Sequence, residues 1–454
     1  MTDKPAVTAE QAPPSVAAAQ VGGAMGIEGT ILTTSETPPV PERVSAGWIW
    51  LFVLAMFGAY TALVAPIGIS LSIRVQQLAP ENVEVLGYII GIGASVAAVW
   101  GPILGMVSDR TRSRFGRRRP YAVAGAIIGV AALGFIAWVP SIPLVVVGWV
   151  FVQIGFSSVM GSLMNTQADR LPEEQRGKVA GLSGFVQMLA SISGVGMASA
   201  FIGNNFLVFL VPGFIGLILV LLYAVFSKEP DSRNIVVADS MTLRKMLQFM
   251  VFNPAKYPDF AWNWLGRLIF MIGVTFATTF TTLFYASRLS TNGRVEDIGA
   301  LIVILSLIGV VSTAGSALAG GILSDKLKRR RIFILSAGIA YTIGAVLMAF
   351  GGSNVAVLII GSIFANVGLG VFSAVDQAIV LDVLPESDTA AGRFIGINGY
   401  STSLAQVIAP VAAAPLLLIG VTGADKNYGV LLLVAAACTL VGGTIVLLFV
   451  RKSS

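Results

Sequence analysis

Residues 105–110 read Gly-Met-Val-Ser-Asp-Arg, and residues 321–326 read Gly-Ile-Leu-Ser-Asp-Lys. The similarity continues along the chain, because Asp-Arg-Leu-Pro-Glu at residues 169–173 returns as Asp-Val-Leu-Pro-Glu at residues 382–386. A third pair follows in the same order and at nearly the same separation: glycines at positions 177, 181 and 184, and again at 392, 396 and 399. An internal repeat of this kind predicts two halves that share one architecture.

The chain that carries these motifs is too apolar for a water-soluble domain. Of its 454 residues, 56% are hydrophobic and 11% are charged, and the mean hydropathy is +0.84. A soluble domain carries roughly 25% charged residues, so lipid must be the solvent for much of this surface. The sequence has no histidine, and its single cysteine, Cys438, lies within an apolar run. We therefore expect no metal site and no disulfide framework.

Twelve apolar runs are long enough to cross a bilayer, which takes about 20 helical residues each. They predict an all-α integral membrane protein with twelve transmembrane helices in two homologous six-helix halves. The predicted spans cover residues 48–72, 85–107, 121–139, 142–165, 178–203, 206–227, 260–287, 297–322, 332–350, 354–380, 392–418 and 428–450.

Lysine and arginine residues predict the orientation of these spans. They gather at residues 110–119, 228–256 and 326–331 and at the C-terminus, whereas the alternate loops hold few. Cytoplasmic loops carry such an excess, so we expect both termini to be cytoplasmic and the protein to lie in the cytoplasmic (inner) membrane. The formal net charge of +6 has the same origin, and we expect no nucleic-acid partner.

The spans divide the chain into four parts. Residues 1–46 have no periodic apolar face and predict a disordered cytoplasmic tail, and residues 228–259 are a cytoplasmic linker. Residues 47–227 and 260–454 are the two six-helix halves. Within the linker, apolar residues at helical spacing between Met241 and Met250 favour a short helix at the membrane surface, with an ordinary linker as the alternative.

The glycine, the aspartate and the basic run at residues 105–119 resemble the signature loop of the major facilitator superfamily, and the resemblance covers about residues 47–450. The longer string Ser-Asp-Arg-Thr-Arg-Ser-Arg-Phe-Gly-Arg-Arg-Arg-Pro at residues 108–120 looks like the loop of sucrose-type proton symporters and related glycoside transporters. The resemblance implies the major facilitator fold and a secondary active transporter, not an enzyme, that works by alternating access. It further implies proton-coupled uptake of a sugar or glycoside, and we expect a monomer with no cofactor apart from the coupling ion, H⁺.

The repeated loop is expected to form a conformational latch at the cytoplasmic ends of the helices. In each copy a guanidinium would bridge two carboxylates, and this chain of charges would hold the outward-open state. Asp109 would also face the N-terminus of the eleventh span near Gly392, where exposed amides favour an anion. For Arg117 to Arg119 we expect only anchoring of the topology. In the first copy the guanidinium that bridges the carboxylates belongs to Arg112 or Arg114, and in the second copy to Arg329 or Arg330. The latch residues are Gly105, Asp109, Arg110, Arg112, Arg114 and Asp169 in the first copy and Asp325, Arg329, Arg330 and Asp382 in the second.

Two charges stand out inside the predicted spans, Arg267 on the seventh and Asp376 on the tenth. An isolated charge in hydrocarbon is costly, so we expect the two to pair or to face water. If substrate binding breaks the pair, Asp376 becomes a proton acceptor; a static structural pair is the alternative. Amides and aromatic rings on the first, fourth, seventh and tenth spans, which line the cavity in the family, suit sugar hydroxyls and a pyranose face. These candidates for the substrate path are Tyr60, Gln153, Asn165, Gln167, Trp262, Asn263, Trp264, Tyr285, Asn366 and Gln377.

Other functions stay open at this point. A proton-coupled exporter of amphipathic small molecules would suit a path rich in Met and Phe, and a non-transporting sensor would share the same scaffold. An integral-membrane enzyme is disfavoured, because the sequence has no histidine, no cysteine pair and no acidic cluster with metal-ligand spacing. No Gly-Lys-Ser/Thr phosphate loop supports ATP-driven transport.

Overall fold

The computed structural model describes residues 43–227, 229, 231–233, 251–386, 391–421 and 426–451, and within these ranges it contains helices and turns but no strand. The predicted tail therefore lies outside the described residues except for positions 43–46. The predicted surface helix between Met241 and Met250 also lies outside them.

The first half begins with a long helix that contains one irregular turn. α1 (Ala46–Ala65) continues through a π-helical turn, η1 (Pro66–Ser70), into α2 (Leu71–Leu78). Proline has no N–H to donate, so Pro66 favours a local widening within an otherwise continuous helix. The remaining helices of this half are α3 (Val85–Asp109), α4 (Arg119–Trp138), α5 (Ile142–Arg170), α6 (Glu173–Ala200) and α7 (Leu207–Phe226).

The second half repeats this order of helices. Its elements are α9 (Pro258–Leu289), the short 3₁₀ turn η2 (Val295–Ile298), α10 (Gly299–Leu327), α11 (Arg330–Phe350), α12 (Val355–Asp382), α13 (Ala391–Leu416) and α14 (Tyr428–Phe449). Side-chain oxygens cap two of these helices, because Asn354 accepts from the backbone N–H groups of Ala356 and Val357, and Asn427 accepts from that of Val430.

Eleven helical stretches of the described chain are long and apolar enough to cross a membrane; α1 to α2 count as one stretch, and so do η2 and α10. α13 is a further helix of 26 residues that does not reach this hydropathy. It packs against α3 and α9, so protein rather than lipid surrounds much of its polar surface. The all-helical membrane architecture predicted from the sequence is confirmed.

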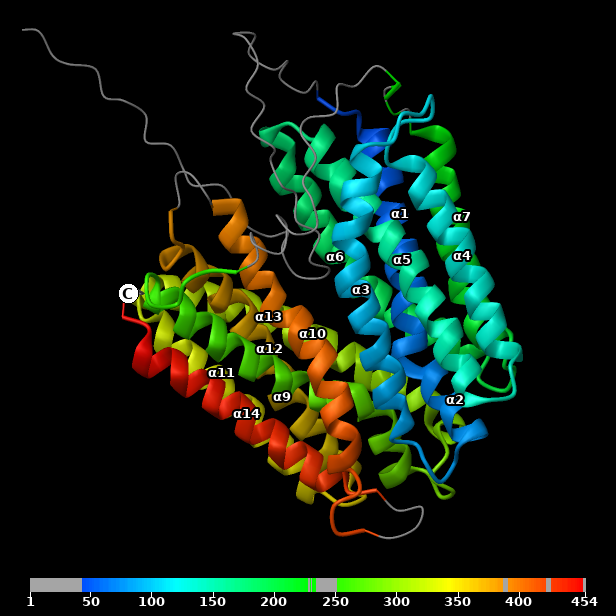
Figure 1. Cartoon of the computed structure of the whole chain (residues 1–454). Coiled ribbons are helices and arrows are strands. Elements are labelled where there is room, and N and C mark those ends of the chain that lie inside the picture. Colours follow the sequence, from blue (N-terminus) through cyan, green and yellow to red (C-terminus); the bar gives the residue numbers. More distant parts are fainter. Residues whose placement is uncertain are drawn as a thin grey trace, which may run out of the picture.

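The helices form two bundles, which Figure 1 shows as a blue-to-green group (α1–α7) and a green-to-red group (α9–α14). Equivalent glycines let equivalent helices approach closely in the two bundles. A Cβ built on Gly155 of α5 would lie 2.6 Å from the carbonyl oxygen of Gly125 on α4. A Cβ on Gly368 of α12, at the equivalent position of the second half, would lie 2.6 Å from the carbonyl oxygen of Ala337 on α11. The internal repeat is therefore also present in the helix packing.

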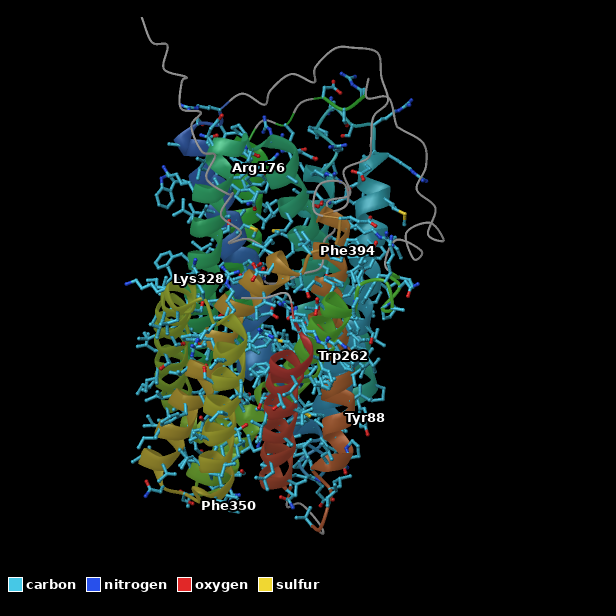
Figure 2. The ribbon with its side chains drawn as sticks, turned by 90° about the vertical axis from the view of Figure 1, so that its left-hand side faces the viewer. Tyr88, Arg176, Trp262, Lys328, Phe350 and Phe394 are labelled. Carbon is cyan, nitrogen blue, oxygen red and sulfur yellow. The ribbon has the colours of Figure 1, made fainter. Side chains whose placement is uncertain are left out.

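The two bundles meet at one end, where α3 packs against α13 and α6 against α10. We call this the closed end; a Cβ on Gly87 would lie 2.2 Å from the carbonyl oxygen of Pro410 there. We call the opposite end, which carries residues 109–119, 227, 229, 231–233, 251–257 and 325–331, the basic end. Figure 2 shows Arg176 toward the basic end and Tyr88 and Phe350 toward the closed end.

Candidate functional site

A glutamine of α2 joins the two halves at the closed end. The side-chain Nε2 of Gln76 donates to the carbonyl oxygen of Gly293 (2.9 Å), and its Oε1 accepts from the backbone N–H of Val295 (3.0 Å). The neighbouring Gln77 donates to Oε1 of Glu296 (3.2 Å). Gln76 thus uses both ends of its amide, and both of its partners are backbone groups of the other half.

Two more polar contacts cross the closed end. Nζ of Lys426 lies 2.9 Å from Oε2 of Glu84, the residue before α3, and these side chains are only 3% and 11% exposed. The hydroxyl of Thr282 on α9 donates to the carbonyl oxygen of Gly68 within η1 (2.5 Å). Partly buried contacts of this kind hold the two halves together at this end.

Among the residues that the structure describes, the basic end is open between the halves. A Cβ built on Gly105, Gly181, Gly184, Gly392 or Gly399 would meet no atom of this part of the chain within 4 Å. Small residues at this spacing are typical of closely packed helices, but Gly181 and Gly184 on α6 and Gly392 and Gly399 on α13 face open space in this conformation. The expected cap of the α13 N-terminus by Asp109 is also absent among the hydrogen bonds and ion pairs of the described residues.

The first copy of the repeated loop contains the predicted carboxylate–guanidinium–carboxylate chain, but with a different arginine. An Nη2 atom of Arg118 lies 2.5 Å from Oδ1 of Asp109, and its Nε lies 3.2 Å from Oδ2 of Asp169. Arg117 contacts the same Asp169 oxygen at 2.8 Å. The prediction of Arg112 or Arg114 as the bridge is wrong here: Arg112 is exposed, and Arg114 lies over the ring of Phe115 at 4.6 Å. Arg110 is an exposed residue just after α3.

The second copy reproduces this cluster with fewer residues. Nη2 of Arg330 lies 2.9 Å from Oδ1 of Asp325, and Nη1 lies 2.6 Å from Oδ1 of Asp382. Arg330 is thus the bridge, and Arg329 precedes α11 as its N-cap residue. The first cluster lies within the first half and the second cluster within the second half. Each cluster joins the ends of neighbouring helices and does not cross between the halves.

A glutamate just after α7 adds to the first cluster. Oε2 of Glu229 accepts from the backbone N–H groups of Arg118 and Arg119, both at 3.4 Å, at the start of α4. Burial raises the pKa of the Glu229 carboxyl above its ordinary value of 4.5, while these two backbone hydrogen bonds act in the opposite direction. Ser232 continues the contact by donating to the carbonyl oxygens of Thr111 and Ser113 (3.0 Å each). The start of the linker therefore docks on the loop before α4.

Arg267 and Asp376 form a buried ion pair between α9 and α12. Nη1 of Arg267 contacts Oδ2 of Asp376, and Nη2 donates to the hydroxyl of Thr402 on α13 (3.1 Å). The side chains are 5% and 1% exposed. Of the two alternatives that the sequence offered, pairing or facing water, the structure shows direct pairing.

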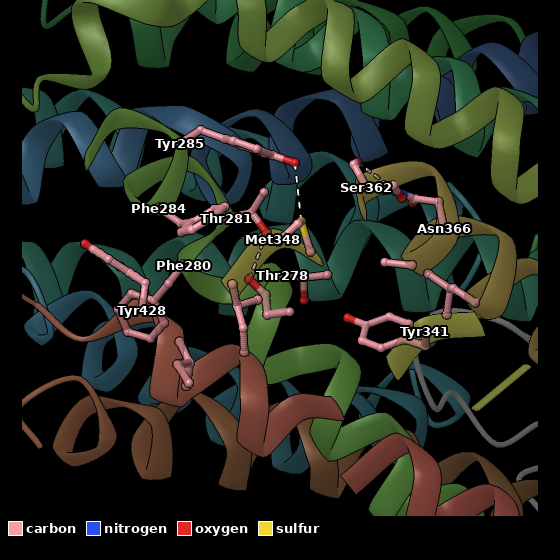
Figure 3. A pocket seen from close by; sticks show the side chains of 15 residues that line it. Thr278, Phe280, Thr281, Phe284, Tyr285, Tyr341, Met348, Ser362, Asn366 and Tyr428 are labelled. Atoms are coloured by element: carbon pink, nitrogen blue, oxygen red, sulfur yellow. Dashed lines mark hydrogen bonds between the residues drawn. The ribbon is translucent and has the colours of Figure 1, made fainter. Parts of the chain in front are cut away.

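The same two helices border a pocket in the second half. Its walls come from α9, α11, α12 and α14 and enclose ≈ 570 Å³ of empty space, part of it open to solvent. Figure 3 shows phenols, hydroxyls and one amide among the apolar side chains, and the hydroxyl of Tyr285 lies 3.7 Å from the sulfur of Met348. The polar lining residues are Thr278, Thr281, Tyr285, Tyr341, Ser362, Asn366 and Tyr428. Two predicted path residues, Tyr285 and Asn366, thus share one pocket.

The other predicted path residues of the second half lie elsewhere. Trp262 stacks on Phe449 of α14 with 4.4 Å between ring centroids, and Trp264 donates to the carbonyl oxygen of Ile397 on α13 (2.9 Å). Both tryptophans therefore join α9 to a neighbouring helix. Asn263 is 1% exposed, and Gln377 lines a small cavity beside Arg267.

The first-half candidates do not reach the pocket of the second half. Tyr60 is buried in α1. Gln153 of α5 packs against Gly93 of α3, since a Cβ built on Gly93 would lie 3.0 Å from the Cγ of Gln153. Asn165 and Gln167 lie near the basic end of α5. None of these four residues lines the pocket that Tyr285 and Asn366 share.

Comparison of the sequence with models of known protein families identifies the family of this two-bundle chain. The chain matches the Major Facilitator Superfamily over residues 9–195, 50–320 and 310–454. It belongs to the Major Facilitator Superfamily. Membership makes the chain a membrane transporter of a small molecule, in agreement with the family predicted from the loop at residues 105–119.

Solved structures of other superfamily members share the fold of this one. The nucleoside transporter NupG has a TM-score of 0.71 with 11% sequence identity, covering 88% of this chain and 98% of that chain. A mutant of NupG gives 0.72 with 11% identity, covering 89% and 100%. A bacterial homologue of the human lysosomal transporter Spinster, in an inward-facing and unoccupied conformation, gives 0.66 with 16% identity, covering 90% and 98%. At these identities the similarity shows the fold alone.

Three contributors to this superfamily member's basic end were missed by sequence reasoning. Arg117 and Arg118 were expected only to anchor topology, and Glu229 was not considered. The signal for Arg118 is its place directly before Arg119, the first residue of α4, where a side chain points back across the ends of the neighbouring helices. Glu229 gives a weaker signal, since only its distance of a few residues from the end of α7 suggests that it stays at the bundle.

Proposed function

We propose that the protein is a proton-coupled secondary transporter that takes up a sugar or glycoside by alternating access, of the sucrose-type symporter kind. The observation that supports this best is the buried Arg267–Asp376 pair, which lies on the same two helices, α9 and α12, that border the pocket. A substrate that separates these helices would also separate the pair and leave Asp376 free to accept a proton.

The pocket supports a glycoside as the substrate class. Phenols, hydroxyls and an amide offer both donors and acceptors for sugar hydroxyls, and rings such as Phe280 and Phe284 offer apolar faces. In this proposal the basic end is cytoplasmic, as the positive charges favour, and both termini lie there in the inner membrane. The structure then represents the inward-open state of a monomeric carrier.

Uptake into proteoliposomes under an inward proton gradient tests the proposal. The substrate panel contains labelled disaccharides, aryl glycosides and nucleosides, each measured with and without protonophore. We expect concentrative uptake that collapses with protonophore. In Asp376→Asn we expect accumulation to be lost and exchange of labelled for unlabelled substrate to persist. The matched control is Asp231→Asn, because Asp231 forms an exposed pair with Arg233 away from the pocket.

Removing one partner of a buried ion pair can unfold the protein, so the double variant Arg267→Gln/Asp376→Asn accompanies the single one. Normal accumulation by a folded Asp376 variant would exclude this residue as the coupling group.

Export of amphipathic molecules is the second candidate function, because the pocket walls also include Met348, Leu369, Leu431 and Leu432. Extrusion of lipophilic cations, with no uptake of any glycoside by folded protein, would favour the exporter.

A further inference from the structure

Five polar atoms around the Arg267–Asp376 pair are buried without a hydrogen-bond partner among the described residues. They are Nε of Arg267, Oδ1 of Asp376, Oδ1 and Nδ2 of Asn263, and Oδ1 of Asn398. Asn263 and Asn398 are 1% and 4% exposed. Native proteins rarely leave buried polar groups unpaired, and a group of five on α9, α12 and α13 indicates a bound ligand that pairs with them.

The chemistry of these atoms selects the class of ligand. Arg267 Nε and Asn263 Nδ2 donate hydrogen bonds, whereas the three oxygens accept them. A metal cation would face the guanidinium of Arg267, and an anion would face the carboxylate of Asp376, so both ions are disfavoured. A small neutral molecule that donates and accepts equally well satisfies the whole set. Water meets this requirement and is the usual partner of buried polar clusters.

A cavity beside the pair provides the space. It is lined by Arg267, Gln377, Asn398 and Gly399 together with apolar side chains, and it encloses ≈ 310 Å³ of empty space, part of it open to solvent. Gln377 is only half-buried, and a Cβ built on Gly399 would meet no atom of the described residues within 4 Å. The cavity therefore extends from the buried pair toward the open space at the basic end.

We propose that ordered water fills this cavity, held by Arg267 and Asn398, and extends to the amide of Asn263, which lies four residues before Arg267 on α9. This water forms the route by which a proton passes between the basic end and Asp376. The first part concerns binding of water, and the second rests on the proposed proton coupling through Asp376. Asp376 is 1% exposed, so it exchanges protons with bulk solvent only through intervening hydrogen-bonded groups. The proton route is thereby separate from the pocket lined by Tyr285 and Asn366.

Thermal unfolding in detergent tests the water cluster without any transported substrate. Asn263→Leu and Asn398→Leu replace each amide by an apolar side chain of similar size. If water pairs with these amides, each variant loses hydrogen bonds beside the ion pair, and we expect its Tm to fall by roughly 2–4 °C. The matched control is Thr61→Val in α1. The Thr61 hydroxyl is fully buried, has no hydrogen-bond partner within the described part of the chain, and lines neither cavity. We expect its Tm to stay constant or rise. An equal or higher Tm in both asparagine variants would overturn the water cluster.

Transport by Asn398→Leu tests the proton route. We expect proton-driven accumulation to slow at least about tenfold, a change of roughly 1.4 kcal/mol in the barrier, while substrate exchange keeps more than about half of its rate. Equal slowing of both processes would overturn the route. If the wild type shows no sensitivity to protonophore, the proposed coupling itself fails, whereas the thermal measurement still decides whether water binds.

Discussion

Arg118 is the residue that ties together three helices at the basic end. Its Nη1 contacts the hydroxyl of Ser108, and its other nitrogens contact Asp109 of α3 and Asp169 of α5. The side chain is only 7% exposed, whereas Asp109 is 53% exposed. Partial burial strengthens charge-assisted hydrogen bonds, so this arginine contributes more than an ordinary surface pair.

We therefore expect Arg118→Ala to destabilise the first half by roughly 1–3 kcal/mol, because Asp109 and Asp169 lose their most buried partner and keep only the more exposed Arg117. Arg112→Ala is the matched control, since Arg112 is an exposed arginine of the same loop. Thermal unfolding of both variants measures the difference. Equal Tm values for the two variants would contradict the role of Arg118.

The sequence predicts the carboxylates of these clusters better than their arginines. Asp109, Asp169, Asp325 and Asp382 all belong to the ion-pair clusters, and each lies within two residues of the end of a long helix, where the apolar pattern stops. The first bridging arginine depends instead on the path of the loop at residues 110–118. Gly116 turns this loop back with φ +87°, a backbone conformation that hydropathy does not reveal.

At the scale of elements, α2 is the helix that hydropathy describes least well. The predicted first span ends at residue 72, but the helix continues to Leu78. Arg74 is buried at 8% exposure because its side chain donates to the carbonyl oxygens of Ile136 and Val139 at the end of α4. Protein groups, not lipid, form the hydrogen bonds that this polar helix needs, so a search by hydropathy does not detect the helix. The same reason explains the low hydropathy of α13.

The contact of Gln76 with residues 293 and 295 gives the prediction at this scale. Gln76→Ala removes two hydrogen bonds at the closed end, worth roughly 1–3 kcal/mol together, and we expect the population to shift toward states with this end open. Distances between spin labels on the two halves, in a Cys438→Ser background, measure the shift. The control is Asn292→Ala in the same loop, where the side chain is exposed. An unchanged distance distribution in Gln76→Ala would show that other contacts hold this end.

At the scale of the whole molecule, the open glycines mark the surfaces that the opposite state requires. α3 with α13, and α6 with α10, already touch at the closed end. Rocking the bundles about that contact brings the same helix pairs together at the basic end, where their glycines now face open space.

Gly181→Leu should therefore leave the present state intact while it slows turnover. We expect an unchanged Tm and transport at least about tenfold slower, because the added side chain obstructs closure of the basic end. Gly203→Leu serves as the control, since its Cβ also faces open space but lies in the turn after α6 at the closed end. Wild-type transport by Gly181→Leu would show that this part of α6 does not approach the other half.

The twofold architecture is predictable from the sequence because the repeat and the apolar runs act over the whole chain. Contacts between the halves are not predictable from the sequence, since they depend on how the two bundles tilt relative to one another. Tyr285 and Asn366 meet in one pocket because α9 and α12 cross in the same bundle, whereas Tyr60 and Gln153 belong to the other bundle and do not reach it.

The amide of Gln76 recognises peptide groups, and this has an evolutionary consequence. Residue 295 contributes only its N–H group to the hydrogen bond, so any residue except proline can form that bond. Residue 293 is constrained by its own φ of +67° and not by its partner. Substitutions on the two sides of this contact then have no reason to compensate one another. Methods that infer contacts from paired changes among related sequences would miss one of the interactions that close the molecule.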